Sequence, residues 1–339
     1  MNIHVRGQIE FEKILDYTFT ESIALTRQRI AIQQLLDQRG TDDDHKQLIR
    51  HLTTYSKGIE SILTKLPETT IQHQPCFSWS IDNETVQSAC WILEAIMPKV
   101  VNYQLHVEVG HQHIQQEQYK DANQCYKTAA KLATETEALT RRWKWKLPTM
   151  NHQILATNWH IAQKHYSECL QQLCTIAVGI QTETNDTVMY TLSQRTLRAA
   201  SLSYMHWKTN EAGSILTLAD GLRYMYSAHI LWNREEYGQS IHRLKKWVAN
   251  QEIPTGNWKL LQKEFEKIPF LLQERIHTNN GAYFGIIQAA TTLPDIQTII
   301  HTKNTTHPKK GPYEDNDPLS DQQRLESDLT TPTSSVGNP

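Results

Sequence analysis

The 339-residue sequence has few of the residues that punctuate β-structure or cross-link a secreted fold. It contains only 13 glycines and 12 prolines, which leaves few turn signals and favours long helices. Its five cysteines are an odd number without paired spacing, so we expect reduced thiols, as in a cytosolic protein. The cysteines are Cys76, Cys90, Cys125, Cys169 and Cys174.

The sequence also lacks an excess of charge and a long hydrophobic run. Basic residues number 34 against 36 acidic ones, and this balance argues against nucleic-acid binding through bulk electrostatics. No apolar run approaches the ~20 residues that span a bilayer. The N-terminus has no apolar segment of the kind found in secretory signals. With 39% hydrophobic residues, the sequence indicates a soluble, non-secreted protein with a buried core.

Motifs that bind nucleotides or zinc are missing as well: there is no GxxxxGK[ST], no GxGxxG after a strand, no CxxC and no HExxH. The best metal candidate combines His106, His111 and His113. On a helix, His106 and His113 would lie ~10 Å apart along the axis, and His111 would point elsewhere. We therefore expect no metal and no cofactor.

Two other groups of residues have a chemical and a structural interpretation. A cysteine nucleophile needs a thiolate and a base, but Cys125, Cys169 and Cys174 fall on helical packing faces and are interpreted as structural. The basic and aromatic run RRWKWK at residues 141–146 would suit phosphates or anionic lipid. We favour a solvated helix end with packing tryptophans. No active site is therefore expected.

Apolar residues recur at helical spacing along most of the chain. They predict one helix around residues 23–36 and a second around 48–63, ended by Pro67. Residues 77–81 alternate between apolar and polar side chains and predict a short strand, followed by a helix from about Asn83. Two further helical stretches cover residues 150–180 and 188–204.

Two segments, residues 105–133 and 222–248, share one pattern. Each has a helix, a short polar loop that ends in Tyr, and a second helix with small or apolar residues at i+3 and i+4. This pattern resembles a tetratricopeptide hairpin, in which small residues let two helices approach closely.

From residue 303 to residue 339 aliphatic residues are almost absent, which predicts a disordered tail after a domain at residues 1–302.

Several short motifs follow one another along the chain. They are HLTTY at 51–55, FSW at 77–79, YKTAA at 126–130, LQQLCTIA at 170–177, EYGQSIHRL at 236–244 and NGAYF at 280–284. In this order and near this spacing they resemble the Bro-one (BRO) domain family, most closely its Brox-like single-domain proteins, and also the N-terminal domain of ALIX. The resemblance implies a mostly α, boomerang-shaped helical solenoid with tetratricopeptide-like hairpins and a small β element.

The resemblance also implies a function. Members of the family are ESCRT-associated adaptors, not enzymes, and act in endosomal sorting or membrane remodelling. They hold the C-terminal amphipathic helix of an ESCRT-III subunit of the CHMP/Snf type in an apolar groove. The chain ends in SVGNP and lacks the C-terminal Cys box of Brox. The resemblance therefore implies a cytoplasmic protein, which its partner recruits to ESCRT-containing membranes.

Alignment of residues 175–177 with the corresponding family helix places the partner-binding floor at Thr175, Val188 and Leu192. Val188 and Leu192 are an i, i+4 pair and would share one helical face. Thr175 is small where ALIX has a large aromatic residue, so we expect a shallower floor and weaker binding. The structural alternative is that this aliphatic pair packs inside the protein.

Two other functions stay open at this point. A generic tetratricopeptide-like scaffold would share the fold and bind a different peptide. An enzyme would use the histidine cluster or a cysteine, and stoichiometric zinc in the purified protein would favour it. The sequence leaves open the cargo, the ESCRT-III subunit and the oligomeric state.

Overall fold

The structure is a computed structural model, and it describes residues 3–6, 9–15, 22–38, 42–66, 77–81, 84–88, 90–143, 153–250 and 258–283. The chain divides into two compact units, Met1–Ala289 and Ala290–Pro339. The second unit lies outside the described residues, and so do the boundary predicted at residue 302 and the tail that follows it. All elements named below belong to the first unit.

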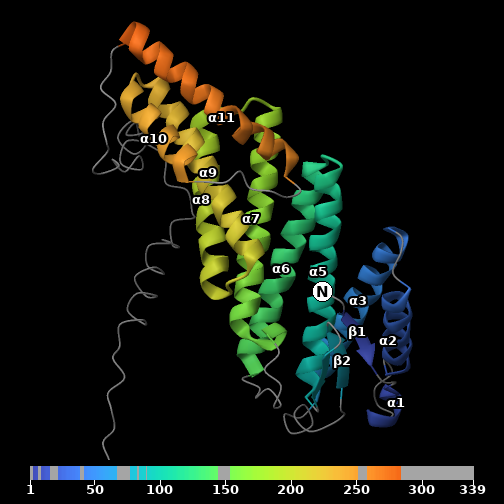
Figure 1. Cartoon of the computed structure of the whole chain (residues 1–339). Coiled ribbons are helices and arrows are strands. Elements are labelled where there is room, and N and C mark those ends of the chain that lie inside the picture. The colour runs from blue at the N-terminus through green and yellow to red at the C-terminus, as the bar shows by residue number, and fades with distance from the viewer. Residues whose placement is uncertain are drawn as a thin grey trace, which may run out of the picture. The chain divides into compact units, whose positions relative to one another are not determined.

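Long helices dominate the first unit, as the sequence predicts (Figure 1). They are α1 (Phe11–Ile14), α2 (Ser22–Asp37), α3 (Asp42–Leu63), α5 (Trp91–Gln115), α6 (Tyr119–Trp143), α7 (Thr157–Gln181), α8 (Asp186–His206), α9 (Asn210–Asn233), α10 (Tyr237–Asn250) and α11 (Lys259–Thr278), with short helical turns at Gln153–Leu155 and Asn279–Tyr283. The helices predicted around residues 23–36, 48–63 and 188–204 are confirmed as α2, α3 and α8.

Three short strands form one antiparallel sheet. They are β1 (Ile3–Arg6), β2 (Phe77–Ile81) and β3 (Glu84–Ser88), in that order across the sheet. The strand predicted at residues 77–81 is confirmed as β2. The helix predicted from about Asn83 is wrong, because β3 occupies this stretch and α5 begins only at Trp91. Val86 is the only aliphatic residue of β3, so pairing with β2, not a pattern in its own sequence, decides its conformation.

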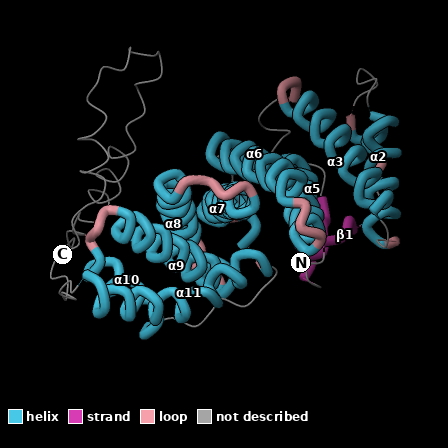
Figure 2. The backbone as a smooth tube through the Cα atoms, turned by 90° about the horizontal axis from the view of Figure 1, so that it is seen from above, coloured by secondary structure: helices cyan, strands magenta, loops and turns pink. Residues whose placement is uncertain are grey.

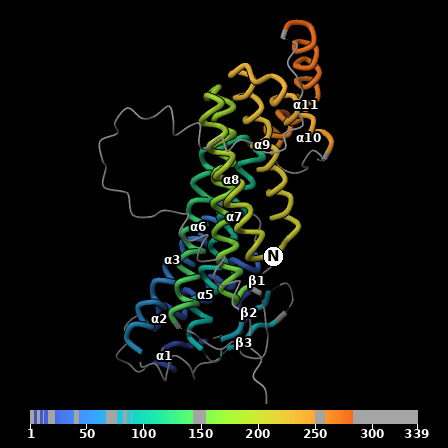
Figure 3. The backbone as a smooth tube through the Cα atoms, turned by 90° about the vertical axis from the view of Figure 1, so that its left-hand side faces the viewer, coloured from blue at the N-terminus to red at the C-terminus, as the bar shows by residue number. Residues whose placement is uncertain are grey.

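One row of apolar side chains crosses the sheet. Val5 of β1 and Val86 of β3 both lie opposite Trp79 of β2, and all three side chains are buried. Figure 3 shows the strands side by side near α1, at the end of the unit away from α10 and α11. The row belongs to the same hydrophobic core as buried residues of α2, α3 and α5.

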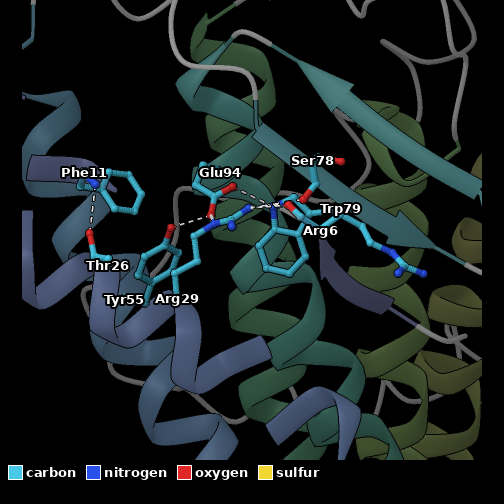
Figure 4. Close-up of polar contacts among 8 residues, drawn as sticks. All are labelled: Arg6, Phe11, Thr26, Arg29, Tyr55, Ser78, Trp79 and Glu94. Carbon is cyan, nitrogen blue, oxygen red and sulfur yellow. Dashed lines mark hydrogen bonds and ion pairs between the residues drawn. The ribbon is translucent and has the colours of Figure 1, made fainter. Parts of the chain in front are cut away.

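A buried carboxylate connects this sheet to three helices (Figure 4). Glu94 of α5 is fully buried, and its Oε1 accepts hydrogen bonds from Arg29 Nε at 2.9 Å and from the Tyr55 hydroxyl at 2.5 Å. Its Oε2 accepts a hydrogen bond from Trp79 Nε1 at 2.8 Å. Arg29 Nη2 donates to a backbone carbonyl of β1 at 3.4 Å and to one of β2 at 3.3 Å. This network therefore holds α2, α3, α5 and two strands together.

The same tight turn joins α5 to α6, α7 to α8 and α9 to α10. Each turn places a glutamate in the left-handed region, with φ of 59° at Glu117, 51° at Glu183 and 67° at Glu235. The residue after each glutamate donates its backbone N–H into the preceding helix at 2.8 or 2.9 Å, as in a Schellman cap. Both hairpins predicted from the repeated pattern are confirmed, and α7–α8 is a third hairpin with the same turn.

One core histidine has no polar partner. His160 of α7 is fully buried, and neither of its ring nitrogens has a hydrogen-bond partner in the described part of the chain. Its ring meets Trp159 edge-on at 5.2 Å between centroids. Burial lowers the pKa of His160 to about 3, so the folded protein holds a neutral imidazole.

Replacing Glu94 with Gln is expected to lower the free energy of unfolding by about 3–5 kcal/mol, because Arg29 would keep its buried charge and lose the counter-charge. Urea denaturation followed by circular dichroism measures this loss. Glu135→Gln is the matched control, since Glu135 is 40% exposed and its partner Lys99 retains Glu60 at 2.7 Å. The control should cost less than about 1 kcal/mol. Equal losses in both variants would contradict the role of the buried network.

Acid is expected to destabilise the fold through His160. Below pH 6.5 the unfolded chain protonates this side chain, whereas the folded chain does so only near pH 3. The unfolding free energy should therefore fall by roughly 1 kcal/mol per pH unit within this window. His160→Leu should flatten this dependence in urea titrations between these pH values, while His277→Leu, at an exposed position, should not. Burial also lowers the pKa of His106, His111 and His229, so part of the acid dependence will remain.

Candidate partner-binding face

Helix α7 lies between α6 and α8 and packs against both of them (Figure 2). On the α8 side, Gly179 lets Met189 approach closely, since a Cβ at this glycine would lie 2.5 Å from the Met189 sulfur. The Thr196 hydroxyl donates to Gln172 Oε1 at 3.4 Å in the same interface. Small and polar residues thus bring α8 close to α7.

The α6 side of α7 is held by an amide. Asn123 Nδ2 donates to the backbone carbonyl of Gln171 at 2.9 Å and to Thr175 Oγ1 at 3.2 Å. Gln171 and Thr175 are one turn apart on α7 and are half-buried and exposed, respectively. The strip of α7 that these two residues occupy is therefore open between its two neighbours.

The structure places Thr175, Val188 and Leu192 on the open side of these helices. Thr175 is exposed, Val188 is 49% exposed and Leu192 is half-buried. Their neighbours Met189 and Ser193 are buried, as are several further residues of α8. Val188 and Leu192 lie one turn apart, so the two aliphatic side chains share one face of α8.

Further residues share this face, although sequence reasoning passed over them. Val178 is half-buried and lies one turn beyond Thr175 on α7, and exposed Arg195 lies one turn beyond Leu192 on α8. Both residues could have been found from the sequence, because Val178 lies at i+3 from Thr175 and Arg195 lies at i+3 from Leu192. Asn123 could be found only in the structure, because α6 and α7 meet through the fold. We call Asn123, Gln171, Thr175, Val178, Val188, Leu192 and Arg195 the α6–α8 face.

Two of the three histidines considered for a metal have separate hydrogen-bond partners. His111 Nδ1 lies 2.9 Å from the Tyr126 hydroxyl, and His113 Nδ1 lies 2.7 Å from Gln118 Oε1. Burial lowers the pKa of His106. Among the described residues, no group of three or more His, Cys, Asp or Glu side chains is placed to hold a metal ion. These histidines therefore contribute to helix packing in the described structure.

The cysteines of the described chain are packing residues. Cys169 and Cys174 are fully buried, Cys125 is partly buried, and burial raises the pKa of all three thiols. A raised pKa keeps the thiol protonated and lowers its nucleophilicity. Cys76 lies outside the described residues.

In the basic run at 141–146, Arg141 pairs with Glu137 of its own helix at 2.8 Å. Residues 144–146 lie outside the described chain. No helix within the described ranges is both long and apolar enough to cross a membrane.

No family model matches the chain, and no curated protein matches it. Solved structures share its fold. The ALIX BRO1 CHMP4C complex aligns with a TM-score of 0.67 and 12% identity, over 87% of this chain and 91% of that chain. ALIX in complex with the SIVmac239 PYKEVTEDL late domain aligns with a TM-score of 0.68 and 14% identity, over 96% of this chain and 52% of that chain.

A Bro1 domain structure, described as a basis for endosomal targeting, aligns with a TM-score of 0.59 and 11% identity, over 88% of this chain and 93% of that chain. The chain therefore has the BRO-domain fold, and the fold predicted from the order of the sequence motifs is confirmed. The Brox-like subtype stays a prediction.

The burial of Cys169 and Cys174 predicts that iodoacetamide leaves both thiols unmodified in the native protein near pH 8, because thiolate and access are both lacking. Peptide mass spectrometry measures the alkylation of each cysteine separately. The same protein in urea serves as the control and should be alkylated at both sites. Rapid native alkylation of either cysteine would revive the nucleophile hypothesis.

Proposed function

We propose that this protein is an ESCRT-associated adaptor, not an enzyme, and that its α6–α8 face binds the C-terminal amphipathic helix of an ESCRT-III subunit. The observation that carries the proposal is the outward position of Val188 and Leu192 on neighbouring turns of α8. A domain with this fold forms the ALIX BRO1 CHMP4C complex. The exposure of Val188 and the partial exposure of Leu192 support a partner at the positions predicted from the family motif.

The chemistry of the face suits a helix that presents aliphatic anchors at i, i+3 or i+4, and i+7. Val188 and Leu192 would be desolvated by such anchors, together with Val178 from the neighbouring helix. Burying one aliphatic side chain contributes roughly 1.5–3 kcal/mol, so a few contacts dominate the affinity. Thr175 offers little apolar area, which supports a modest affinity. The partner helix would also bring the protein to ESCRT-containing membranes.

The second candidate is a tetratricopeptide-like scaffold that binds a different peptide. The three hairpins with the same turn favour it, because such hairpins form peptide-binding surfaces in repeat proteins. Both candidates use the same fold, so only the identity of the bound peptide separates them.

The test uses fluorescence anisotropy with a labelled synthetic C-terminal helix of a CHMP4-type ESCRT-III subunit. Val188→Asp is expected to weaken binding at least about tenfold, because it places a carboxylate against the aliphatic anchors. Leu192→Asp should have the same effect. Met205→Asp is the matched control: Met205 is 61% exposed on the same helix but outside the α6–α8 face, so its affinity should not change.

Circular dichroism and thermal melting establish whether each variant is still folded, so that a loss of binding can be assigned to the substituted side chain. Val188→Asp and Met205→Asp change exposed side chains and should melt like the wild type. A folded Val188→Asp protein that binds the helix normally would refute the site. Absence of binding by the wild type would favour the second candidate.

A further inference from the structure

A row of lysines on α6 lies across the open strip of α7 from the aliphatic residues of α8. Lys120, Lys127 and Lys131 are exposed, and they lie at i−3, i+4 and i+8 from Asn123. Residues at this spacing share one side of a helix. Asn123 itself contacts Gln171 and Thr175, so this side of α6 adjoins the open strip of α7. We call Lys120, Lys127 and Lys131 the lysine row.

The lysine row is largely uncompensated within the described structure. Lys131 lies 3.9 Å from Glu135, and this carboxylate also accepts a hydrogen bond from Lys99 at 2.6 Å. Lys120 and Lys127 form no ion pair with any residue that the structure describes.

One carboxylate and one guanidinium also lie along the face, so the three lysines remain its net charge. On α7, Glu168 lies two turns before Thr175 and places its carboxylate on the open strip, 2.9 Å from His165 Nδ1. Exposed Arg195, one turn beyond Leu192, adds a positive charge from α8. The open strip of α7 is therefore flanked by aliphatic residues on the α8 side and by positive charge on the α6 side.

A helix that lies along α7 meets these two borders with two adjoining sides of its own surface. Its apolar stripe would face Val188 and Leu192, and the neighbouring flank would face the lysine row. Resting on the function proposed above, we infer that the helix bound by this face carries carboxylates along one flank of its apolar stripe, the flank that faces α6. The apolar anchors supply most of the affinity, and the lysine row selects the acidic helix and fixes its rotation about its own axis.

The experiment compares three synthetic helical peptides of about 18 residues, long enough for five turns. They share one leucine stripe and carry Glu, Gln or Lys at the same positions on one flank. Fluorescence anisotropy with the full-length protein should rank them Glu, Gln, Lys, with about tenfold between Glu and Gln, and the difference should shrink in high salt.

The decisive variant reverses two charges. Lys120→Glu combined with Lys127→Glu should weaken the Glu peptide about tenfold, strengthen the Lys peptide and leave the Gln peptide nearly unchanged. The matched control is Lys245→Glu with Lys246→Glu, which reverses two exposed charges on α10 and should leave the ranking as in the wild type. All four positions are exposed, so both variants should keep the wild-type circular dichroism spectrum.

Failure of this inference can be told apart from failure of the proposed function. If Val188→Asp abolishes binding of all three peptides while the wild type binds them equally, charge selection is overturned and the docking face stands. If the α10 control changes the ranking as much as the lysine-row variant, the effect is one of net charge, and the inference is again overturned. If Val188→Asp changes no affinity, the proposed face itself fails.

Discussion

The fold depends on one buried carboxylate. Glu94 accepts hydrogen bonds from Arg29, Tyr55 and Trp79, so it joins two helices and a strand to α5 within 2.9 Å. Burial and the nearby Glu94 carboxylate raise the pKa of Tyr55, so its hydroxyl remains protonated and continues to donate. A buried ion pair stabilises a fold only when its remaining hydrogen-bonding groups also have partners. Here the strand carbonyls that accept hydrogen bonds from Arg29 provide such partners. The N-terminal sheet is therefore anchored on α5.

From α5 onward, the arrangement follows from repetition. Three hairpins use the same left-handed glutamate turn, which leaves the second helix of each antiparallel to the first. Glycine permits the close contacts in between: at Gly110 a Cβ would lie 2.6 Å from the Tyr126 ring, and at Gly221 one would lie 2.4 Å from Trp247. Helix α7 packs against α6 on one side and α8 on the other, and the strip around Gln171 and Thr175 stays open between them. The candidate binding face is this strip with its two borders.

Local sequence patterns predicted the helices in which apolar residues repeat at helical spacing over several turns. Residues of α2, α3, α6 and α10 have apolar side chains at helical spacing, and a helix can be recognised from such spacing without knowledge of its neighbours. The strand β3 could not be recognised, because it has one core residue and takes its conformation from hydrogen bonds with β2. The same limit applies to the site. The pair Val188 and Leu192 was visible as an i, i+4 spacing, whereas the contact of Asn123 with Thr175 joins residues far apart in the chain.

The sequence by itself determined that the chain forms long amphipathic helices with a short strand at residues 77–81, and its ordered motifs indicated the BRO-domain fold. It also determined that Val188 and Leu192 share a helical face, since 3.6 residues per turn is a local property. Only the tertiary structure decided that this face is accessible and that the lysine row of α6 borders the neighbouring strip of α7. The physical reason is that burial and the proximity of charges depend on which helices pack together, and this packing is set by contacts between distant residues such as Arg29 and Glu94.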